Sequence, residues 1–168
     1  IGVWDGAATR LEIMADPDFM RHAIQLAEKM MRAGRGGPFG AVIVLEGTVI
    51  AEGYNKVTSD NDPTAHAEVV AIREACATLG TFSLQGSEIF TNCEPCPMCL
   101  AAIYWARLDQ IWYGNTRGDA ARIGFDGDHI YREIPLAIED RAIPMVRLLP
   151  DEAAAAFREW DSKTDKVM

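Results

Sequence analysis

Two short motifs, H-A-E at residues 66–68 and P-C-P-M-C at residues 95–99, constrain this chain more than any other feature. We expect each motif to lie at the start of a helix, so a fold that uses both must bring two helix N-termini together. Cysteines three residues apart share one face of a helix, and with the histidine they supply one imidazole and two thiolates. A catalytic zinc site has three such protein ligands and keeps its fourth position for water, whereas a structural site fills all four. The motifs therefore predict a zinc site formed by His66, Cys96 and Cys99.

Glu68 follows the histidine by two residues, and we expect it to carry protons rather than to bind the metal. Bound zinc lowers the pKa of a water molecule from about 15.7 to about 7, which yields hydroxide at neutral pH. The hydroxide would attack an amino-bearing carbon, while Glu68 passes the water proton to a ring nitrogen and afterwards helps to protonate the leaving ammonia. H-x-E followed by P-C-x-x-C is typical of zinc enzymes that deaminate nucleobases. The pattern indicates hydrolytic removal of an amino group from a heteroaromatic ring.

The net charge of −9, from 25 acidic and 16 basic residues, argues against a nucleic-acid partner. Proteins that bind DNA or RNA draw much of their affinity from lysine and arginine on phosphates, and this acidic chain has no basic cluster. Three of its four cysteines, Cys93, Cys96 and Cys99, lie within seven residues, a spacing that suits metal binding better than a disulfide framework. Free thiolates and zinc imply a reducing compartment, so we expect a cytoplasmic protein.

The length of 168 residues suits one compact domain, and we expect a single deaminase domain over residues 1–168. Residues 1–15 form an irregular start in this interpretation, and residues 151–168 form a C-terminal helix and tail. No apolar run approaches the roughly 20 residues that span a bilayer, and the first residues lack a secretory signal. We therefore expect no membrane partner.

Local patterns predict strands that alternate with helices, which is typical of a three-layer α/β domain with a mixed sheet. Asp16-Pro17 is a helix-start signal and Gly34 a stop signal. The expected helices cover residues 17–33, 63–79, 96–106 and 150–160, with a helical turn at 119–123. The expected strands cover residues 39–45, 49–54, 87–91, 110–114 and 145–149, with a hairpin turn at 46–47 and an irregular segment at 55–62.

Cys93 leaves an alternative open, because C-x-x-C-x-x-C could hold an iron–sulfur cluster or supply a fourth zinc ligand. The iron–sulfur alternative leaves the H-A-E motif unexplained and finds no suitably spaced fourth cysteine. His22 and His129 have no cysteine or carboxylate partner at ligand spacing, so we interpret them as ordinary core or surface residues. Cys76 lies among alanines and a leucine and is expected to pack in the core.

Longer stretches of the chain resemble the bacterial guanine deaminase family, within the cytidine-deaminase-like superfamily. The resemblance covers about residues 18–160. The zinc motifs are shared across the superfamily, whereas the N-D-P-T-A-H-A-E and I-G-F-D blocks indicate its purine-specific branch. The matching blocks are G-G-P-F-G-A-V-I-V at 36–44, N-D-P-T-A-H-A-E at 61–68, C-E-P-C-P-M-C-L at 93–100, A-I-Y-W-A-R at 102–107 and I-G-F-D at 123–126.

This resemblance implies a three-layer α-β-α sandwich with a mixed five-stranded sheet, and a homodimer whose C-terminal segments cross to close the partner's active site. It implies one zinc per subunit on His66, Cys96 and Cys99, with Glu68 as the proton shuttle. The implied substrate contacts are the Asn55 amide, a stacking Phe39, the Ala67 backbone, Asp126, Asp128 and Trp105. From its pattern alone, Phe39 is better interpreted as a core residue of a strand.

Two departures from the family pattern affect the expected substrate site. The family block usually reads G-F-D-D, and its second aspartate assists catalysis and guanine recognition, but Gly127 stands there in this chain. Either Asp126 or Asp128 substitutes for it, or the substrate differs. The family also tends to end in a tyrosine that reaches the partner's site, one residue beyond Met168 by this count. Trp160 or Phe157 could contribute to the lid instead.

The leading hypothesis is a zinc-dependent aminohydrolase that converts guanine to xanthine and ammonia. The same chemistry on guanosine or on a triazine such as ammeline is the nearest alternative. A tRNA adenosine deaminase shares both motifs, although the acidic balance disfavours it. A non-catalytic module stabilised by zinc is the remaining alternative, and it would need Cys93 as the fourth ligand.

Overall fold

The computed structural model describes residues 15–166 of this chain. The described residues form two compact units, residues 15–132 and residues 133–166. The irregular start expected over residues 1–15 lies outside the described residues except for Ala15, and so does the end of the expected tail at residues 167–168. The first unit contains the sheet and both zinc motifs.

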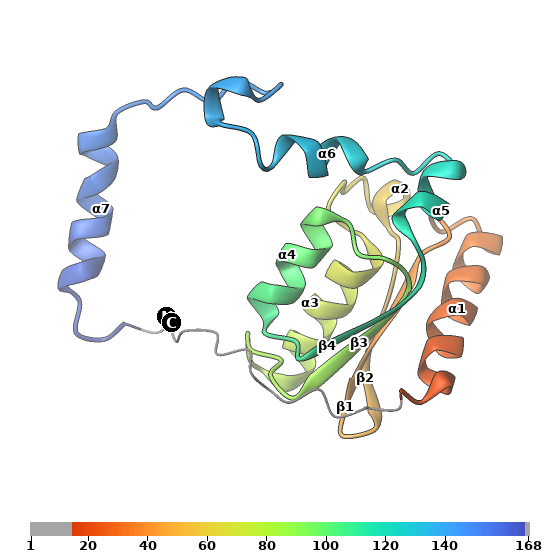
Figure 1. Ribbon diagram of the computed structural model, residues 1–168. Coiled ribbons are helices and arrows are strands. Elements are labelled where there is room, and N and C mark those ends of the chain that lie inside the picture. The colour runs from red at the N-terminus through yellow and green to blue at the C-terminus, as the bar shows by residue number, and fades with distance from the viewer. Residues whose placement is uncertain (1–14, 167–168) are drawn as a thin grey trace. The chain divides into compact units, whose positions relative to one another are not determined.

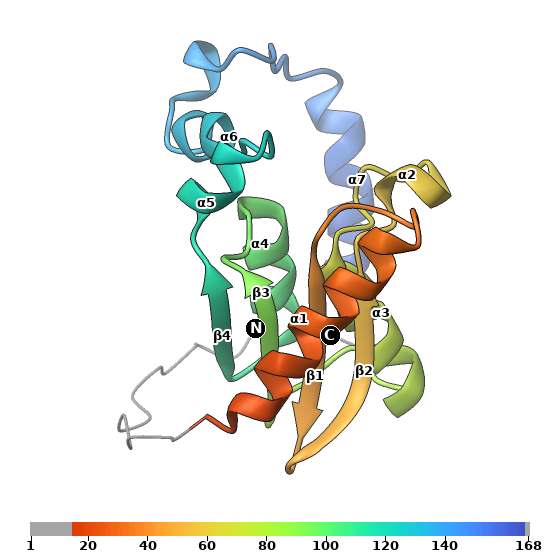
Figure 2. The ribbon, with the colours of Figure 1, turned by 90° about the vertical axis from the view of Figure 1, so that its right-hand side faces the viewer.

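The sheet of the first unit has four strands in the order β2-β1-β3-β4 (Figure 2). β1 runs antiparallel to both β2 and β3, while β4 runs parallel to β3, so the sheet is mixed as expected. The strands are β1 (Gly40–Leu45), β2 (Thr48–Tyr54), β3 (Ser87–Cys93) and β4 (Gln110–Asn115).

Helices cover both faces of this sheet (Figure 1). α1 (Pro17–Arg32) packs on one face against Val42, Val44 and Phe90. α3 (Ala67–Leu79) and α4 (Pro97–Ala106) pack on the other face, against a second cluster that includes Ala41 and Ile43. Successive residues of a strand point to opposite faces, so the apolar run of β1 serves both cores. The predicted α/β class is confirmed.

The expected fifth strand at residues 145–149 is wrong. These residues form no strand, and no strand of residues 15–166 pairs with them. A strand requires a neighbour that satisfies its N–H and C=O groups, and a run of apolar residues does not reveal whether that neighbour exists. In the second unit the segment instead leads into α7 (Pro150–Ser162), after the short 3₁₀ helix η1 (Ile138–Asp140).

The helix expected from residue 63 begins later, at Ala67. Thr64 donates its backbone N–H to the Asp62 side chain at 2.8 Å, and this turn keeps the preceding residues out of the helix. His66 is consequently the N-cap residue of α3. The sequence patterns did not predict the short helices α2 (Val57–Asp60) and α6 (Asp128–Glu133). They placed the helical turn at residues 119–123, whereas α5 covers Arg117–Arg122.

Gly53 allows β2 to lie directly against the first turns of α3. A Cβ at this position would lie 2.0 Å from the Ala67 carbonyl oxygen and 2.5 Å from the Ala71 nitrogen, so any other residue would force the strand and helix apart. This contact places the H-A-E motif at the carboxyl end of β2. None of the described helices is long and apolar enough to cross a membrane.

Candidate metal centre and surrounding cavity

The starts of α3 and α4 bring three ligand atoms together. His66 and Cys96 are the N-cap residues of the two helices, and Cys99 lies in the first turn of α4. The His66 Nδ1 atom is 3.6 Å from the Cys96 Sγ atom and 3.5 Å from the Cys99 Sγ atom, and the two Sγ atoms are 3.5 Å apart. The convergence of two helix N-termini that the motifs required is therefore present.

These distances fit a tetrahedral zinc ion. Zinc–nitrogen bonds of about 2.0–2.1 Å and zinc–sulfur bonds of about 2.3 Å at tetrahedral angles give N···S separations of about 3.6 Å and an S···S separation of about 3.8 Å. Among the described residues, the group of ligand side chains consists of His66, Cys96 and Cys99 without a fourth member. Cys93 does not join it, since its Sγ atom lies 3.8 Å from the Thr116 carbonyl oxygen. Three protein ligands are the arrangement of a catalytic rather than a structural zinc site.

Their surroundings shift the pKa values of the two ligand cysteines in opposite directions. The hydrogen bond with Cys99, followed by that with His66, lowers the pKa of Cys96 to about 4. The same sulfur–sulfur hydrogen bond, together with burial, raises the pKa of Cys99, while the bond to Cys96 raises the pKa of His66. One thiolate is thus stabilised at neutral pH, which is the form that binds metals.

Glu68 lies in the first turn of α3, next to this group but outside it. Its side chain is 6% exposed, and burial raises the pKa of its carboxyl group above the usual value. A carboxyl group whose pKa moves toward neutrality can both accept and return a proton. Its position and burial are those that a proton shuttle requires.

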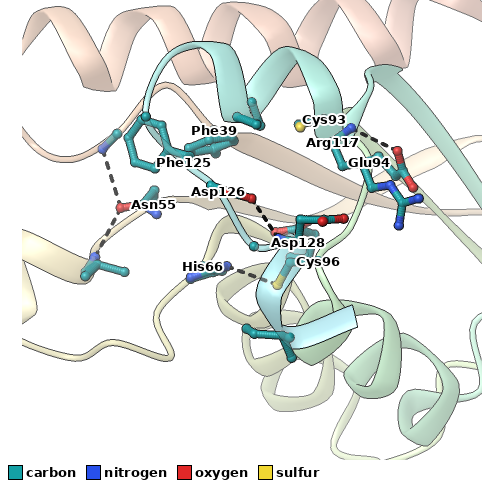
Figure 3. Close-up of a pocket in the computed structure, with 18 of the residues that line it drawn as sticks. Phe39, Asn55, His66, Cys93, Glu94, Cys96, Arg117, Phe125, Asp126 and Asp128 are labelled. Carbon is teal, nitrogen blue, oxygen red and sulfur yellow. Dashed lines mark hydrogen bonds between the residues drawn. The ribbon is translucent and has the colours of Figure 1, made fainter. Parts of the chain in front are cut away.

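The metal group opens into a cavity of 990 Å³ in the first unit (Figure 3). Of the sequence-predicted substrate contacts, Phe39, Asn55, Asp126 and Asp128 line this cavity. Ala67 does not line it and is fully buried. Trp105 also lies outside the lining, on α4, where it is 85% exposed. The structure therefore brings four of the six expected substrate residues to the metal group.

The Asn55 amide is fixed by the backbone around it. Its Oδ1 atom accepts hydrogen bonds from the Gly37 nitrogen at 3.4 Å and the Val57 nitrogen at 3.3 Å, while its own backbone nitrogen donates to the Phe39 carbonyl. In the hydrogen bonds of the described residues the Nδ2 group has no acceptor, so it is the part of the amide left to bind a ligand. Asn55 consequently offers a donor to the cavity.

Two phenylalanines form an aromatic corner in the cavity. The rings of Phe39 and Phe125 meet edge to face, with centroids 4.8 Å apart at an angle of 87°. Phe39 also packs against the core, as the alternative interpretation expected, while its stacking on a substrate stays a prediction. Phe125 was not selected from the sequence, although it lies inside the I-G-F-D block. Flat apolar surfaces of this kind suit a heteroaromatic ring.

The two aspartates that flank Gly127 are both held by local contacts. The Asp126 Oδ1 atom accepts the Asp128 backbone N–H at 2.9 Å, and the Asp128 Oδ2 atom lies 3.5 Å from the Arg132 Nε atom. A Cβ built on Gly127 would meet nothing within 4 Å, so the cavity is open where the family block has its second aspartate. Each carboxylate would have to share its oxygens with these partners in order to contact a substrate.

Several lining residues were not selected from the sequence. Arg117 and Tyr131 belong to no metal or catalytic motif, and the packing of α5 and α6 brings them to the cavity. Glu94 lies in the loop between β3 and α4, directly before the P-C-P-M-C motif. His129, interpreted as an ordinary residue, also lines the cavity. The other histidine, His22, does not line the cavity. Its Nε2 atom lies 2.8 Å from the Glu52 Oε1 atom.

Comparison with known proteins agrees with this geometry. The model of the cytidine and deoxycytidylate deaminase zinc-binding region matches residues 14–115. Guanine deaminase of Bacillus subtilis is 50% identical over 148 residues, which is 88% of this chain and 95% of that protein. Its crystal structure superposes with a TM-score of 0.89 at 48% identity, over 92% of this chain and 99% of the other.

Two further relatives cover less of the chain or are less similar. A guanine deaminase structure from Nitrosomonas europaea has a TM-score of 0.63 at 30% identity, over 89% of this chain and 87% of that one. The tRNA-specific adenosine deaminase of Agrobacterium fabrum is 46% identical over 89 residues, only 52% of this chain and 59% of that protein. The zinc motifs, the three-ligand group and these similarities converge: the chain is a zinc-dependent hydrolytic deaminase of the cytidine and deoxycytidylate deaminase zinc-binding family, and within it belongs with the bacterial guanine deaminases.

Proposed function

We propose that this enzyme converts guanine and water to xanthine and ammonia. The observation that carries the proposal is the buried Glu68 carboxyl beside a three-ligand metal group, at one side of a cavity with an aromatic corner. Most of the length of the Bacillus subtilis guanine deaminase matches this chain, which supports a purine base as the substrate.

His66, Cys96 and Cys99 would hold the zinc ion. When bound, zinc acts as a Lewis acid and lowers the pKa of water to about 7. Glu68 accepts a proton from the attacking water and delivers it to the ring nitrogen next to the amino-bearing carbon. Glu68 then takes the remaining proton of the added hydroxyl group and delivers it to the amino group, so the carbonyl forms as the C–N bond breaks and ammonia leaves. Because its carboxyl is buried, Glu68 holds the transferred proton without competition from bulk water.

The purine ring lies against the aromatic corner of Phe39 and Phe125 in this proposal. Asn55 donates from its Nδ2 group to an acceptor of the ring edge, since its Oδ1 atom is occupied by backbone donors. A site that hydrogen-bonds a substrate group rejects analogues that lack it more strongly than an apolar pocket does. Asn55 therefore contributes to the choice among aminated rings.

A substrate panel tests this proposal. We expect zinc-loaded protein to release ammonia from guanine with a higher kcat/KM than from guanosine or ammeline. Xanthine formation, followed by chromatography, checks that the ammonia comes from the ring amine. Turnover of guanosine or ammeline without turnover of guanine would leave the chemistry intact and show that the proposed substrate is wrong.

A tRNA substrate is disfavoured, although the chain shares its motifs with tRNA-specific enzymes. The net charge of −9 opposes the phosphate contacts on which such binding depends, and the match to the Agrobacterium enzyme covers only 59% of its length. A salt-dependent gel shift with tRNA would be evidence for this alternative.

Four free cysteines and the thiolate ligands support a reducing, cytoplasmic location.

We also propose that the protein is a homodimer in which residues 133–166 of each subunit pack against the other. Considered by itself, this second unit exposes large apolar side chains, among them Val146 at 86% and Phe157 at 81%, and α7 contains no buried residue. Apolar surface of this extent marks a contact surface. Light scattering should give twice the 18.5 kDa chain mass, and a monomer at micromolar concentration would contradict the proposal.

A further inference from the structure

Two residues of the cavity wall contact the loop that presents the metal ligand Cys96. This loop joins β3 to α4 and includes Glu94 and Pro95. The Tyr131 hydroxyl of α6 donates to the Pro95 carbonyl oxygen at 3.1 Å. The Arg117 backbone N–H at the start of α5 donates to the Glu94 Oε2 atom at 2.9 Å (Figure 3).

The same two wall residues also contact each other. The Arg117 guanidinium lies over the Tyr131 ring, with its central carbon 4.6 Å from the ring centroid. Cation–π contacts of this geometry are attractive and hold the ring in one orientation. Glu94, Arg117, Tyr131 and Pro95 thus form a closed set of contacts between the wall and the ligand loop, which we call the latch.

The position of the Pro95 carbonyl matters because it belongs to the peptide bond that precedes Cys96. Peptide groups are planar, so a hydrogen bond to this oxygen restrains the plane from which the Cys96 side chain emerges. Cys96 is also the N-cap residue of α4, with an extended backbone (φ −66°, ψ 169°). The Tyr131 hydroxyl consequently acts on the direction of a metal ligand that it does not touch.

The latch also restrains the part of the cavity wall that lies between α5 and α6. Residues 123–127 connect α5 and α6 and have no helix or strand of their own. Phe125 belongs to this connection, and the centroid of its ring lies 4.8 Å from that of the Phe39 ring. Arg117 in the preceding helix α5 and Tyr131 in the following helix α6 are both held by the latch, so this connection has little freedom to move Phe125 away from Phe39.

We propose that Tyr131 is a positioning residue that couples the purine-facing wall of the cavity to the loop carrying the ligand Cys96. Its hydroxyl and ring hold both parts at once, so the aromatic corner and the metal group keep a fixed separation. This inference rests on the proposed function for its substrate. Its effect on the metal group is independent of which ring is deaminated.

Tyr131→Phe removes the hydroxyl and keeps the ring under Arg117. We expect the KM for guanine to rise by roughly two- to tenfold, the range for loss of one neutral hydrogen bond, with kcat within about twofold of the parent value. Zinc release to a chromogenic chelator should accelerate by a similar factor. Tyr113→Phe, the same change on the exposed β4 strand outside the cavity lining, is the matched control and should change neither quantity.

Arg117→Met keeps an apolar stem over the ring. It should raise the KM for guanine and accelerate zinc release, as Tyr131→Phe does, but by smaller factors. The effects of the two substitutions should not add, because both act on one set of contacts. Unchanged KM and zinc release in Tyr131→Phe would overturn the proposal, as would a lower melting temperature alone or a change in only one of the two quantities. If the parent protein does not deaminate guanine, the proposed substrate fails, while the zinc-release comparison still decides the role of Tyr131.

Discussion

Glu68→Gln should retain zinc and lose about 10² to 10⁴ in kcat, the contribution usual for general acid–base catalysis. The amide has nearly the same size and can occupy the same buried position, but it cannot accept the water proton or return it. Since Glu68 is not part of the metal group, the ligand set stays complete. Zinc content by atomic emission and ammonia release from guanine measure the two halves of this expectation on one preparation.

Glu74→Gln provides the matched control, because Glu74 lies on the same helix with its side chain in solvent. It should keep both zinc and activity. Turnover above a tenth of the parent rate in zinc-loaded Glu68→Gln protein would show that another group carries the proton. The buried carboxyl would then have a structural role only.

Cys99→Ala should abolish both zinc binding and activity. It leaves two of three protein ligands, and because even outer-shell substitutions weaken metal binding by about 10- to 100-fold, we expect zinc affinity to fall by at least about 100-fold. A ligand that binds only the folded state stabilises it by about 2.7 kcal/mol at a concentration of 100 times its Kd. Zinc should therefore raise the melting temperature of the chelator-treated parent but not that of the variant.

Cys93→Ala is the matched control for Cys99→Ala. It distinguishes the loss of a zinc ligand from the removal of a buried sulfur atom. Both cysteines are buried, but only Cys99 belongs to the group of ligand atoms. Cys93→Ala should keep one zinc per chain and keep the zinc-induced rise in melting temperature. If it instead loses zinc, Cys93 is the fourth ligand of a closed site. That result would favour the alternative of a non-catalytic zinc module over the three-ligand site.

The group of metal ligands was predictable from the sequence because its chemistry depends on residue type and on short spacing, whereas the role of Glu68 as proton shuttle stays a prediction. His66, Cys96 and Cys99 are the residue types that zinc prefers. The local signals placed each of them near a helix start, although α3 begins at Ala67 rather than at residue 63. The same local signals predicted α1 and the four observed strands. Asp16 caps α1, with its side chain accepting the Asp18 N–H and Pro17 opening the helix, as these residues imply.

The incorrect fifth strand and the missed cavity residues have a common cause. Pairing of residues 145–149 and the approach of Tyr131 to Pro95 both depend on contacts between segments distant in the sequence, and no local pattern records them. The same holds for Trp105, which shares a block with the family but lies outside the cavity.

The amino-acid sequence by itself determined the reaction chemistry of this protein, because three ligand types and a carboxylate within two short motifs leave few alternatives to a zinc site. Only the tertiary structure decided where the cavity wall lies and how the flanking groups are used. It showed that Asp126 and Asp128 are engaged locally, that Asn55 offers a donor, and that Phe125 completes the aromatic corner. The physical reason is that metal affinity follows from the ligand atoms, whereas substrate recognition follows from the distances and free hydrogen-bonding groups that packing leaves.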